Sequence, residues 1–181
     1  MKKLLFLLAA IVFLPLTAQA KLYQNYTYNF EIDFADRWYD DNSQQENLPD
    51  LITTRVNTSK EGKLGIFWLY VSPYKKYSSI NDFTPKQKNQ LFMKTSNQLL
   101  KKYQKATVYY GQYELVGDYT MLVVKISAIN ETKTPIQIIQ TLTIADNKMY
   151  AFRLVTQDLT GEQEKQFIQM LKTFKNLHWI H

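Results

Sequence analysis

The segment EIDFADRWYDDN, residues 31–42, gathers acidic side chains around Trp38. Carboxylates are preferred ligands of Ca²⁺ and Mg²⁺, so an acidic metal site or a catalytic site is one interpretation. The spacing lacks the alternating acidic positions, the central glycine and the distal glutamate of a calcium-binding loop. The other interpretation is a turn at Asp36 and Arg37 after which Trp38 folds back onto a sheet as a structural anchor. We favour the anchor, and we expect neither a metal nor another cofactor. The aspartates concerned are Asp33, Asp36, Asp40 and Asp41.

Side chains suited to general acid–base or nucleophilic catalysis are sparse. Histidine occurs only at His178 and His181, beside the C-terminus, where chain ends fray. The chain has no cysteine, no G-x-S-x-G turn and no H-E-x-x-H helix. We therefore predict no catalytic residue. Paired carboxylates drawn from Glu31, Glu46 and Glu114 remain open as the acid and base of a glycan hydrolase.

Tyrosine is abundant, with thirteen residues, and four of them, Tyr109, Tyr110, Tyr113 and Tyr119, cluster in one expected hairpin. Aromatic platforms bind sugars and nucleic-acid bases, although most tyrosines on a sheet only cover its face and leave the hydroxyl in water. We keep Tyr109, Tyr110 and Tyr113 as a predicted ligand-binding site, which would suit a small-ligand carrier.

Charge is segregated along the chain. Residues 72–113 hold eight lysines and one acid, whereas residues 31–50 hold seven acids and one arginine. We predict that Lys94, Lys101 and Lys105 form a basic helix face that binds a partner, the simpler alternative being a solvated face. Near an anionic membrane each lysine contributes about 1 kcal/mol, so three support only transient docking. Lysine without interleaved arginine does not favour nucleic acid.

Apolar periodicity indicates the strands that must position these side chains. Alternation or bulky apolar runs predict strands at 28–34, 51–57, 64–71, 107–116, 119–130, 135–144 and 148–156, with a loop at 39–50. The last four runs have short connections, which join antiparallel neighbours. Because two of them, at 119–130 and 135–144, are apolar on both faces, we expect the sheet to be covered on both sides.

Two helices are predicted as that cover. One begins at Thr84, where TPKQ offers a capping box and a proline at the first helical position, and runs to about Lys105. It buries one face and exposes the lysines on the other. The second begins at Thr160 with the box TGEQ. The buried faces comprise Leu91, Thr95, Leu99, Tyr103 and Ala106 in the first helix, and Phe167, Met170, Leu171 and Phe174 in the second.

Two motifs resemble a known family. NFEIDFADRWY is similar to the F-x-I-x-F-P-x-x-W motif of the PsbP-like superfamily, and FIQMLKTFK is similar to its F-x-x-I-L-x-S-F motif. Ala35 replaces the usual proline and Thr173 the usual serine. The resemblance, which extends to bacterial envelope proteins of the DcrB type, implies an α+β fold. Its antiparallel sheet of about six to seven strands would be covered by helices on both faces, as an α/β/α sandwich. It also implies a largely non-enzymatic domain that binds partners.

The first twenty residues are typical of a signal peptide. Lys2 and Lys3 precede the apolar run from Leu4 to Leu14, and AQA at 18–20 is a small-residue cleavage site. We expect cleavage after Ala20, a periplasmic or secreted protein, and a single domain over residues 21–181 without a transmembrane segment.

These patterns together predict an exported, non-enzymatic binding or accessory module of the bacterial envelope. It would dock to an envelope protein or an anionic surface partly through its basic helix, and it would not bind nucleic acid. The formal net charge of the chain, +6, is compatible with an anionic partner. Two alternatives remain open: an envelope-glycan hydrolase with paired carboxylates, and a small-ligand carrier.

Overall fold

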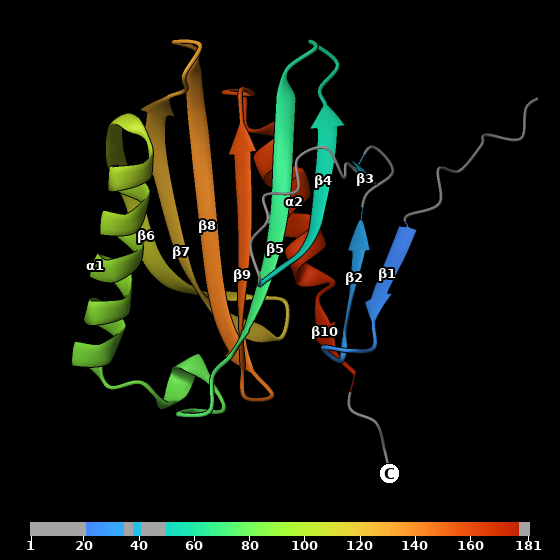
Figure 1. Cartoon of the computed structure of the whole chain (residues 1–181), viewed down its shortest axis with the longest axis vertical. Coiled ribbons are helices and arrows are strands. Elements are labelled where there is room, and N and C mark those ends of the chain that lie inside the picture. The colour runs from blue at the N-terminus through green and yellow to red at the C-terminus, as the bar shows by residue number, and fades with distance from the viewer. Residues whose placement is uncertain (1–20, 35–37, 41–49, 178–181) are drawn as a thin grey trace, which may run out of the picture.

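The computed structural model describes residues 21–34, 38–40 and 50–177 of the chain (Figure 1). Several sequence predictions fall outside this described part: the signal peptide at 1–20, the turn at Asp36 and Arg37, and side chains further along the chain. Those side chains are Asp41, Glu46, His178 and His181.

A seven-stranded antiparallel sheet forms the centre of the molecule, in the order β3-β4-β5-β9-β8-β7-β6. Every strand run predicted from residue 51 onward is confirmed, and β6 begins three residues earlier than expected, at Gln104. Its pairing with β7 is interrupted twice, between Gln104 and Thr107 and between Val108 and Tyr110. The strands are β3 (Tyr39–Asp40), β4 (Leu51–Thr58), β5 (Leu64–Pro73), β6 (Gln104–Val116), β7 (Tyr119–Ile129), β8 (Pro135–Ala145) and β9 (Lys148–Thr156).

A second, three-stranded sheet was not predicted. Its order is β1 (Lys21–Asn25), β2 (Phe30–Phe34) and β10 (Lys175–Asn176), so the two ends of the described chain meet on β2. Sequence analysis found β2 because its apolar side chains alternate. It missed β1, which is mostly exposed and carries no periodic signal. The closing segment NLHWIH, residues 176–181, suggests one more short strand, but only Asn176 of it belongs to β10.

Helix α1 (Pro85–Lys102) begins where it was predicted to begin. The Gln87 backbone N–H donates to the Thr84 hydroxyl at 3.3 Å, and the Thr84 N–H donates to the Gln87 side-chain oxygen at 2.8 Å. This capping box satisfies two donors of the first turn. A single 3-10 turn, η2 (Ile80–Asp82), precedes it.

The predicted end of α1 is wrong. The helix stops at Lys102, Tyr103 has extended backbone angles, and Lys105 lies in β6 with a left-handed φ of 49°. The polypeptide has already turned back into the sheet there, so Lys105 is not part of the helix face.

The predicted start of the second helix is also wrong in detail. Helix α2 (Glu162–Lys172) has Gly161 at its N-cap, with a φ of 84° and no side-chain cap bond. The Thr160 hydroxyl instead donates to Asp158 at 2.6 Å, and Gln163 turns into the interior. Within the described residues, neither helix is long and apolar enough to cross a membrane.

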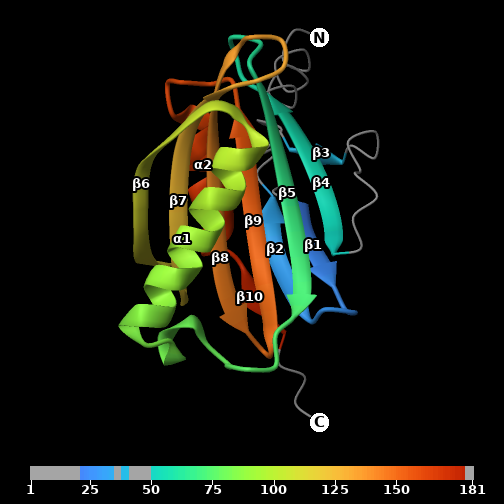
Figure 2. The ribbon, with the colours of Figure 1, turned by 60° about the vertical axis from the view of Figure 1, so that its left-hand side comes forward.

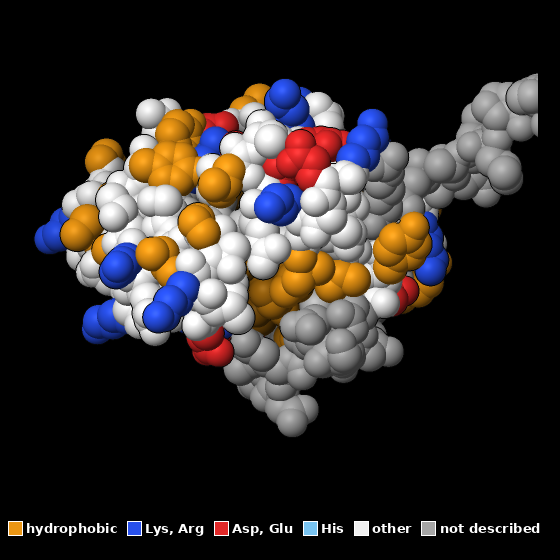
Figure 3. Space-filling model, turned by 90° about the horizontal axis from the view of Figure 1, so that it is seen from above, with side chains coloured by type: hydrophobic (Ala, Val, Ile, Leu, Met, Phe, Trp, Pro, Cys, Tyr) orange, Lys and Arg blue, Asp and Glu red, His pale blue; other side chains and the backbone are white. Residues whose placement is uncertain are grey.

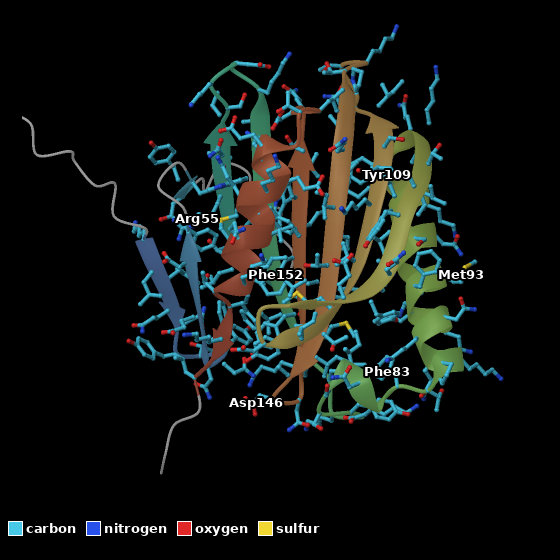
Figure 4. The ribbon with its side chains drawn as sticks, turned by 180° about the vertical axis from the view of Figure 1, so that it is seen from behind. Arg55, Phe83, Met93, Tyr109, Asp146 and Phe152 are labelled. Atoms are coloured by element: carbon cyan, nitrogen blue, oxygen red, sulfur yellow. The ribbon has the colours of Figure 1, made fainter. Side chains whose placement is uncertain are left out.

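The two faces of the large sheet carry separate cores. One core contains Phe67, Phe152 and Phe167, and it is closed by α2 together with the three-stranded sheet (Figure 4). The other contains Leu122 and Leu99 and is closed by α1, which lies over β6 and β7, with η2 at one end (Figure 2). The expectation of helices on both faces is therefore met in part. Each face carries one helix, but the small sheet shares one face and α1 leaves much of the other open.

Candidate functional site

On the face of the large sheet that carries α1, no other described helix covers β9 and β5, because α2 lies on the opposite face (Figure 1). Strand register places side chains there in rows across β5, β9 and β8. Trp68, Arg153 and Gln140 form one row. Their chain neighbours Phe67 and Phe152 point into the opposite core. Trp68 and Arg153 are only half-buried, so no described element fully covers this part of the sheet, which we call the floor.

Two clefts lie on this floor. The apolar cleft, of about 530 Å³, is at the end of the sheet near the β7–β8 turn, with Ile66, Trp68 and Val155 in its lining. The basic cleft, of about 600 Å³, lies between α1 and the middle of β9. Lys102 lines both, so the two clefts are adjacent, and we call them together the α1 groove. Seen from above, hydrophobic side chains gather on this end of the molecule, with separate lysine or arginine side chains around them (Figure 3). Both volumes are within the range of protein binding sites.

Arg153 is held in a defined position at the floor of the basic cleft. Its Nε–H donates to the side-chain oxygen of Gln140 at 2.7 Å. Gln140 is only 3% exposed, and its amide nitrogen donates to the carbonyl oxygens of Phe152 at 3.2 Å and Thr141 at 3.3 Å. The guanidinium carbon lies 5.5 Å from the ring centroid of Tyr70, a cation–π distance. A buried amide and an aromatic ring thus orient the arginine.

Among the described residues, the charged side chains that line the basic cleft are mostly cationic. They are Lys94, Lys102 and Arg153, against the one described carboxylate of Asp50. Among the described residues, Arg153 makes no ion pair. An excess of positive charge over a partly apolar floor attracts an anionic group on an apolar body.

The lysines predicted to bind a partner do not form one stripe. Lys94 is exposed and lines the basic cleft, whereas Lys101 is exposed and lines neither cleft. Lys105 belongs to β6, as described above. Sequence analysis did not select Lys102, although its spacing from Lys94 and Gln98 places all three on one side of a helix. Partner binding by the chosen lysines stays a prediction.

The predicted tyrosine site is divided between the two faces of the sheet. Tyr113 packs under α1 and donates to the Lys88 carbonyl at 2.8 Å, and burial raises the pKa of Tyr113 to about 12. Tyr110 packs on the α2 side. Its hydroxyl donates to Glu114, and this bond is the main reason that its pKa is raised. Tyr109 is half-exposed, and none of the three lines the α1 groove.

Trp38 and Asp40, from the acidic segment, have structural contacts. Trp38 is 3% exposed and meets Phe67 edge-on, with 6.4 Å between ring centroids, which is the packing that an anchor requires. Asp40 pairs with the buried Arg55 at 2.7 Å. The Arg55 guanidinium also lies 4.6 Å from the Phe34 ring (Figure 4). Burial lowers the pKa of Arg55, and the negative charge of Asp40 opposes that shift.

The other candidate carboxylates are separated. Glu31 accepts from the side chain of Gln24 at 3.1 Å, and Glu114 accepts from Tyr110. Each cleft is lined by one carboxylate among the described residues, Glu131 in the apolar cleft and Asp50 in the basic cleft. In the same part of the chain, no group of three or more His, Asp or Glu side chains is placed to hold a metal ion.

Solved structures share this architecture. Cyanobacterial PsbP (CyanoP) of Synechocystis sp. PCC 6803 superimposes with a TM-score of 0.63 at 13% identity, over 88% of this chain and 93% of that one. The Ran-binding protein Mog1p of Saccharomyces cerevisiae gives 0.54 at 11% identity, over 89% and 97%. A Bacteroides thetaiotaomicron protein gives 0.56 at 11%, over 87% of this chain and 48% of its own.

No protein-family model and no curated protein sequence matches the chain. Identities as low as those of the structural neighbours show the fold alone. The resemblance predicted from the two terminal motifs is confirmed at that level: the chain has the PsbP-like fold.

Proposed function

We propose that the protein is an exported, non-enzymatic accessory module of the bacterial envelope that binds a partner protein through the α1 groove. The observation that carries this proposal is the open sheet floor, on which half-buried Trp68 and Tyr70 lie beside lysines of α1. Transient protein interfaces combine an apolar centre with a polar or charged rim. The fold is also that of a Ran-binding protein, Mog1p, which supports a binding role.

We further propose that the protein belongs with the DcrB-type envelope proteins within the PsbP-like superfamily. The support is the signal-peptide pattern at residues 1–20 together with the two terminal motifs. If this is right, the mature protein isolated from a bacterial periplasm or culture medium begins at Lys21. Mass spectrometry of the intact protein measures this directly, and a chain that retains residues 1–20 would contradict export by cleavage.

Site-specific photo-crosslinking tests the binding role. A benzoylphenylalanine at Gln98, an exposed residue of α1 that lines the basic cleft, should capture a discrete envelope protein in intact cells. The matched control carries the same group at Leu22, an exposed residue of β1 in the small sheet. Capture from Gln98 and not from Leu22, identified by mass spectrometry, supports the proposal. Identical products from both positions, or none from Gln98, would refute it.

The small-ligand carrier is a second candidate, because the two clefts have volumes suited to a small molecule. Its site would be the α1 groove, since the three predicted tyrosines lie elsewhere. Native mass spectrometry of the mature protein separates the two functions. A retained molecule that is lost in Trp68→Ala would favour the carrier, whereas a bare protein favours the accessory module. The hydrolase has no such support, because each cleft is lined by a single described carboxylate.

A further inference from the structure

Arg153 is a charged residue in the middle of a sheet face that is otherwise weakly polar, so a function for it is expected. Arg153 stands directly between Trp68 of β5 and Gln140 of β8 in the strand register. Trp68 lines the adjoining apolar cleft, and Ala151 and Leu142 lie in the next row of the floor. A guanidinium on such a surface is most stable when an anion meets it.

Gln140 and Tyr70 fix the orientation of Arg153, which is only half-buried. The guanidinium is a planar fork with five N–H donors, of which the Nε–H goes to Gln140. Among the described residues, Gln140 is its hydrogen-bond partner, so the remaining donors can serve a ligand. Gln140 is itself fixed by two backbone carbonyls, so the fork is positioned before a ligand arrives. Planar carboxylates match this fork with two parallel hydrogen bonds.

The shape of the α1 groove indicates an extended ligand. Its lining follows β9 from Met149, in the basic cleft, to Thr156, in the apolar cleft. At about 3.3 Å per residue, this stretch of strand is about 23 Å long, the length of about seven residues of extended peptide. The lining of the α1 groove changes along β9, from lysine side chains in the basic cleft to mainly apolar side chains in the apolar cleft.

We propose that Arg153 anchors a carboxylate side chain of an extended segment of the partner protein, with an apolar side chain of the same segment against Trp68. This inference rests on the proposed function, because it names the chemistry of the segment that occupies the α1 groove. Charge complementarity favours this occupant, because the described residues that line the basic cleft include three cationic side chains and one acid.

A paired peptide library tests the inference without a known partner. Acetylated heptapeptides with a fixed central glutamate and mixed apolar residues beside it are passed over the immobilised mature protein. The matched library has a fixed central glutamine. We expect the glutamate peptides to bind at least about tenfold more tightly, because a charge-assisted bidentate contact is replaced by a neutral one. Retention is measured by mass spectrometry.

Three variants locate the effect. Arg153→Gln and Lys101→Gln each remove one positive charge, the first from the floor of the groove and the second from the outward side of α1. The glutamate preference should disappear in Arg153→Gln and persist in Lys101→Gln. Arg153→Lys keeps the charge but lacks the fork, and it should lose most of the preference. It also serves as the test if Arg153→Gln does not fold in a thermal unfolding control.

Several outcomes would overturn the inference. These are equal binding of the two libraries, no binding of either, a preference that survives in Arg153→Lys and Arg153→Gln, or a preference lost equally in Lys101→Gln. Binding to phosphatidylglycerol vesicles that needs Arg153, without a peptide preference, would reassign the site to lipid. If Gln98 captures a partner as efficiently in Arg153→Lys as in the wild type, the inference fails and the proposed function stands. If Gln98 captures nothing, the proposed function itself fails.

Discussion

Gly111 determines how closely helix α1 approaches strand β6. A Cβ atom at this position would lie 2.1 Å from Cε2 of the Phe92 ring, well inside van der Waals contact. The Phe92 ring would have to leave its rotamer, or the helix or the strand would have to move. We expect Gly111→Ala to lower the free energy of unfolding by about 1–3 kcal/mol, the usual cost of overpacking. Urea denaturation measures this.

A second substitution separates the steric effect from other effects of the new methyl group. In the background Phe92→Leu, the smaller side chain leaves room, and Gly111→Ala should cost clearly less than it does in the wild type. An unchanged cost would show that the contact with Phe92 is not what requires glycine at this position.

Asp158 is a buried carboxylate with a defined set of donors before α2. One carboxylate oxygen accepts from the Thr160 hydroxyl at 2.6 Å, and the other accepts from the Gln163 backbone N–H at 2.9 Å. Burial alone would raise the pKa of Asp158, but these hydrogen bonds hold its pKa below the ordinary value. The ionised form therefore stabilises the folded state.

This gives a pH-dependent prediction. At pH 7, Asp158→Asn should lower the free energy of unfolding by about 1 kcal/mol, because hydrogen bonds to a charged acceptor become neutral ones. The depressed pKa makes this contribution fully present above the unfolded-state value of about 3.9, and the difference should shrink as the pH falls below it. Denaturant titrations between pH 7 and pH 3 follow the difference. A difference between the wild type and Asp158→Asn that stays constant over this pH range would contradict the argument.

At the scale of elements, local sequence signals predicted those structures that local contacts determine. The Thr84 box is a bond between a residue and its third neighbour, and it formed as predicted. The equivalent pattern at Thr160 did not, because Gln163 is drawn inward to Asn57, where its amide donates to the side-chain oxygen at 3.1 Å. Gly65 leaves the space that Gln163 fills. The contact of Gln163 with Asn57, a residue of β4 about a hundred positions earlier in the chain, outweighs the local capping motif at Thr160. The local sequence around Thr160 gives no sign of this contact.

The same limit applies to the end of α1 and to the candidate site. Tyr103 and Ala106 continue the helical apolar period, yet the chain leaves the helix at Lys102 to enter β6. The α1 groove combines residues of β5, β8 and β9 that no sequence spacing relates, so Arg153 and Trp68 were not candidates. The strands were predicted, but the register that places Trp68 beside Arg153 requires the structure.

The two sides of α1 allow a matched test of its lysines. Lys94 lines the basic cleft and Lys101 does not, although both are exposed on the same helix. We expect Lys94→Glu to reduce crosslinking of the partner from Gln98 by about tenfold or more at low salt, because it reverses a charge at the groove. Lys101→Glu makes the same change in net charge and should have a much smaller effect.

Ionic strength provides the control for this comparison. Raising the salt concentration should weaken capture by the wild type and narrow its difference from Lys94→Glu, since exposed charges are screened over about 10 Å at 0.1 M salt. Equal losses in Lys94→Glu and Lys101→Glu would show that general charge, and not the groove, attracts the partner.

At the scale of the whole molecule, Phe174 is one of the aromatic residues that join the small sheet to the large one. Phe174 is fully buried, and its ring centroid lies 4.9 Å from that of Tyr150, 5.1 Å from those of Phe152 and Tyr119, and 5.9 Å from that of Phe30. These partners belong to β2, β7 and β9. The two sheets therefore share a core and should unfold together.

Truncation of this residue tests the shared core. Phe174→Ala should lower the free energy of unfolding by about 3–5 kcal/mol, as for other large cavities. Circular dichroism and tryptophan fluorescence should still give one coincident transition. Leu115→Ala, at a side chain that is 74% exposed, should change stability by less than about 0.5 kcal/mol. Separate transitions in the wild type would show that the small sheet is an independent unit.

The two ends of the large sheet bear on how the protein behaves at high concentration. A straight strand with free N–H and C=O groups can recruit a strand from another molecule and start aggregation. At one end, β3 has only two residues. At the other, the long strand β6 is interrupted twice in its pairing with β7, and Lys105 adopts a left-handed conformation there. Such irregularities twist the backbone away from a flat template. Both ends of the large sheet are therefore poor templates for a strand from another molecule, and we expect that the large sheet does not start fibrils in concentrated solutions of the folded protein.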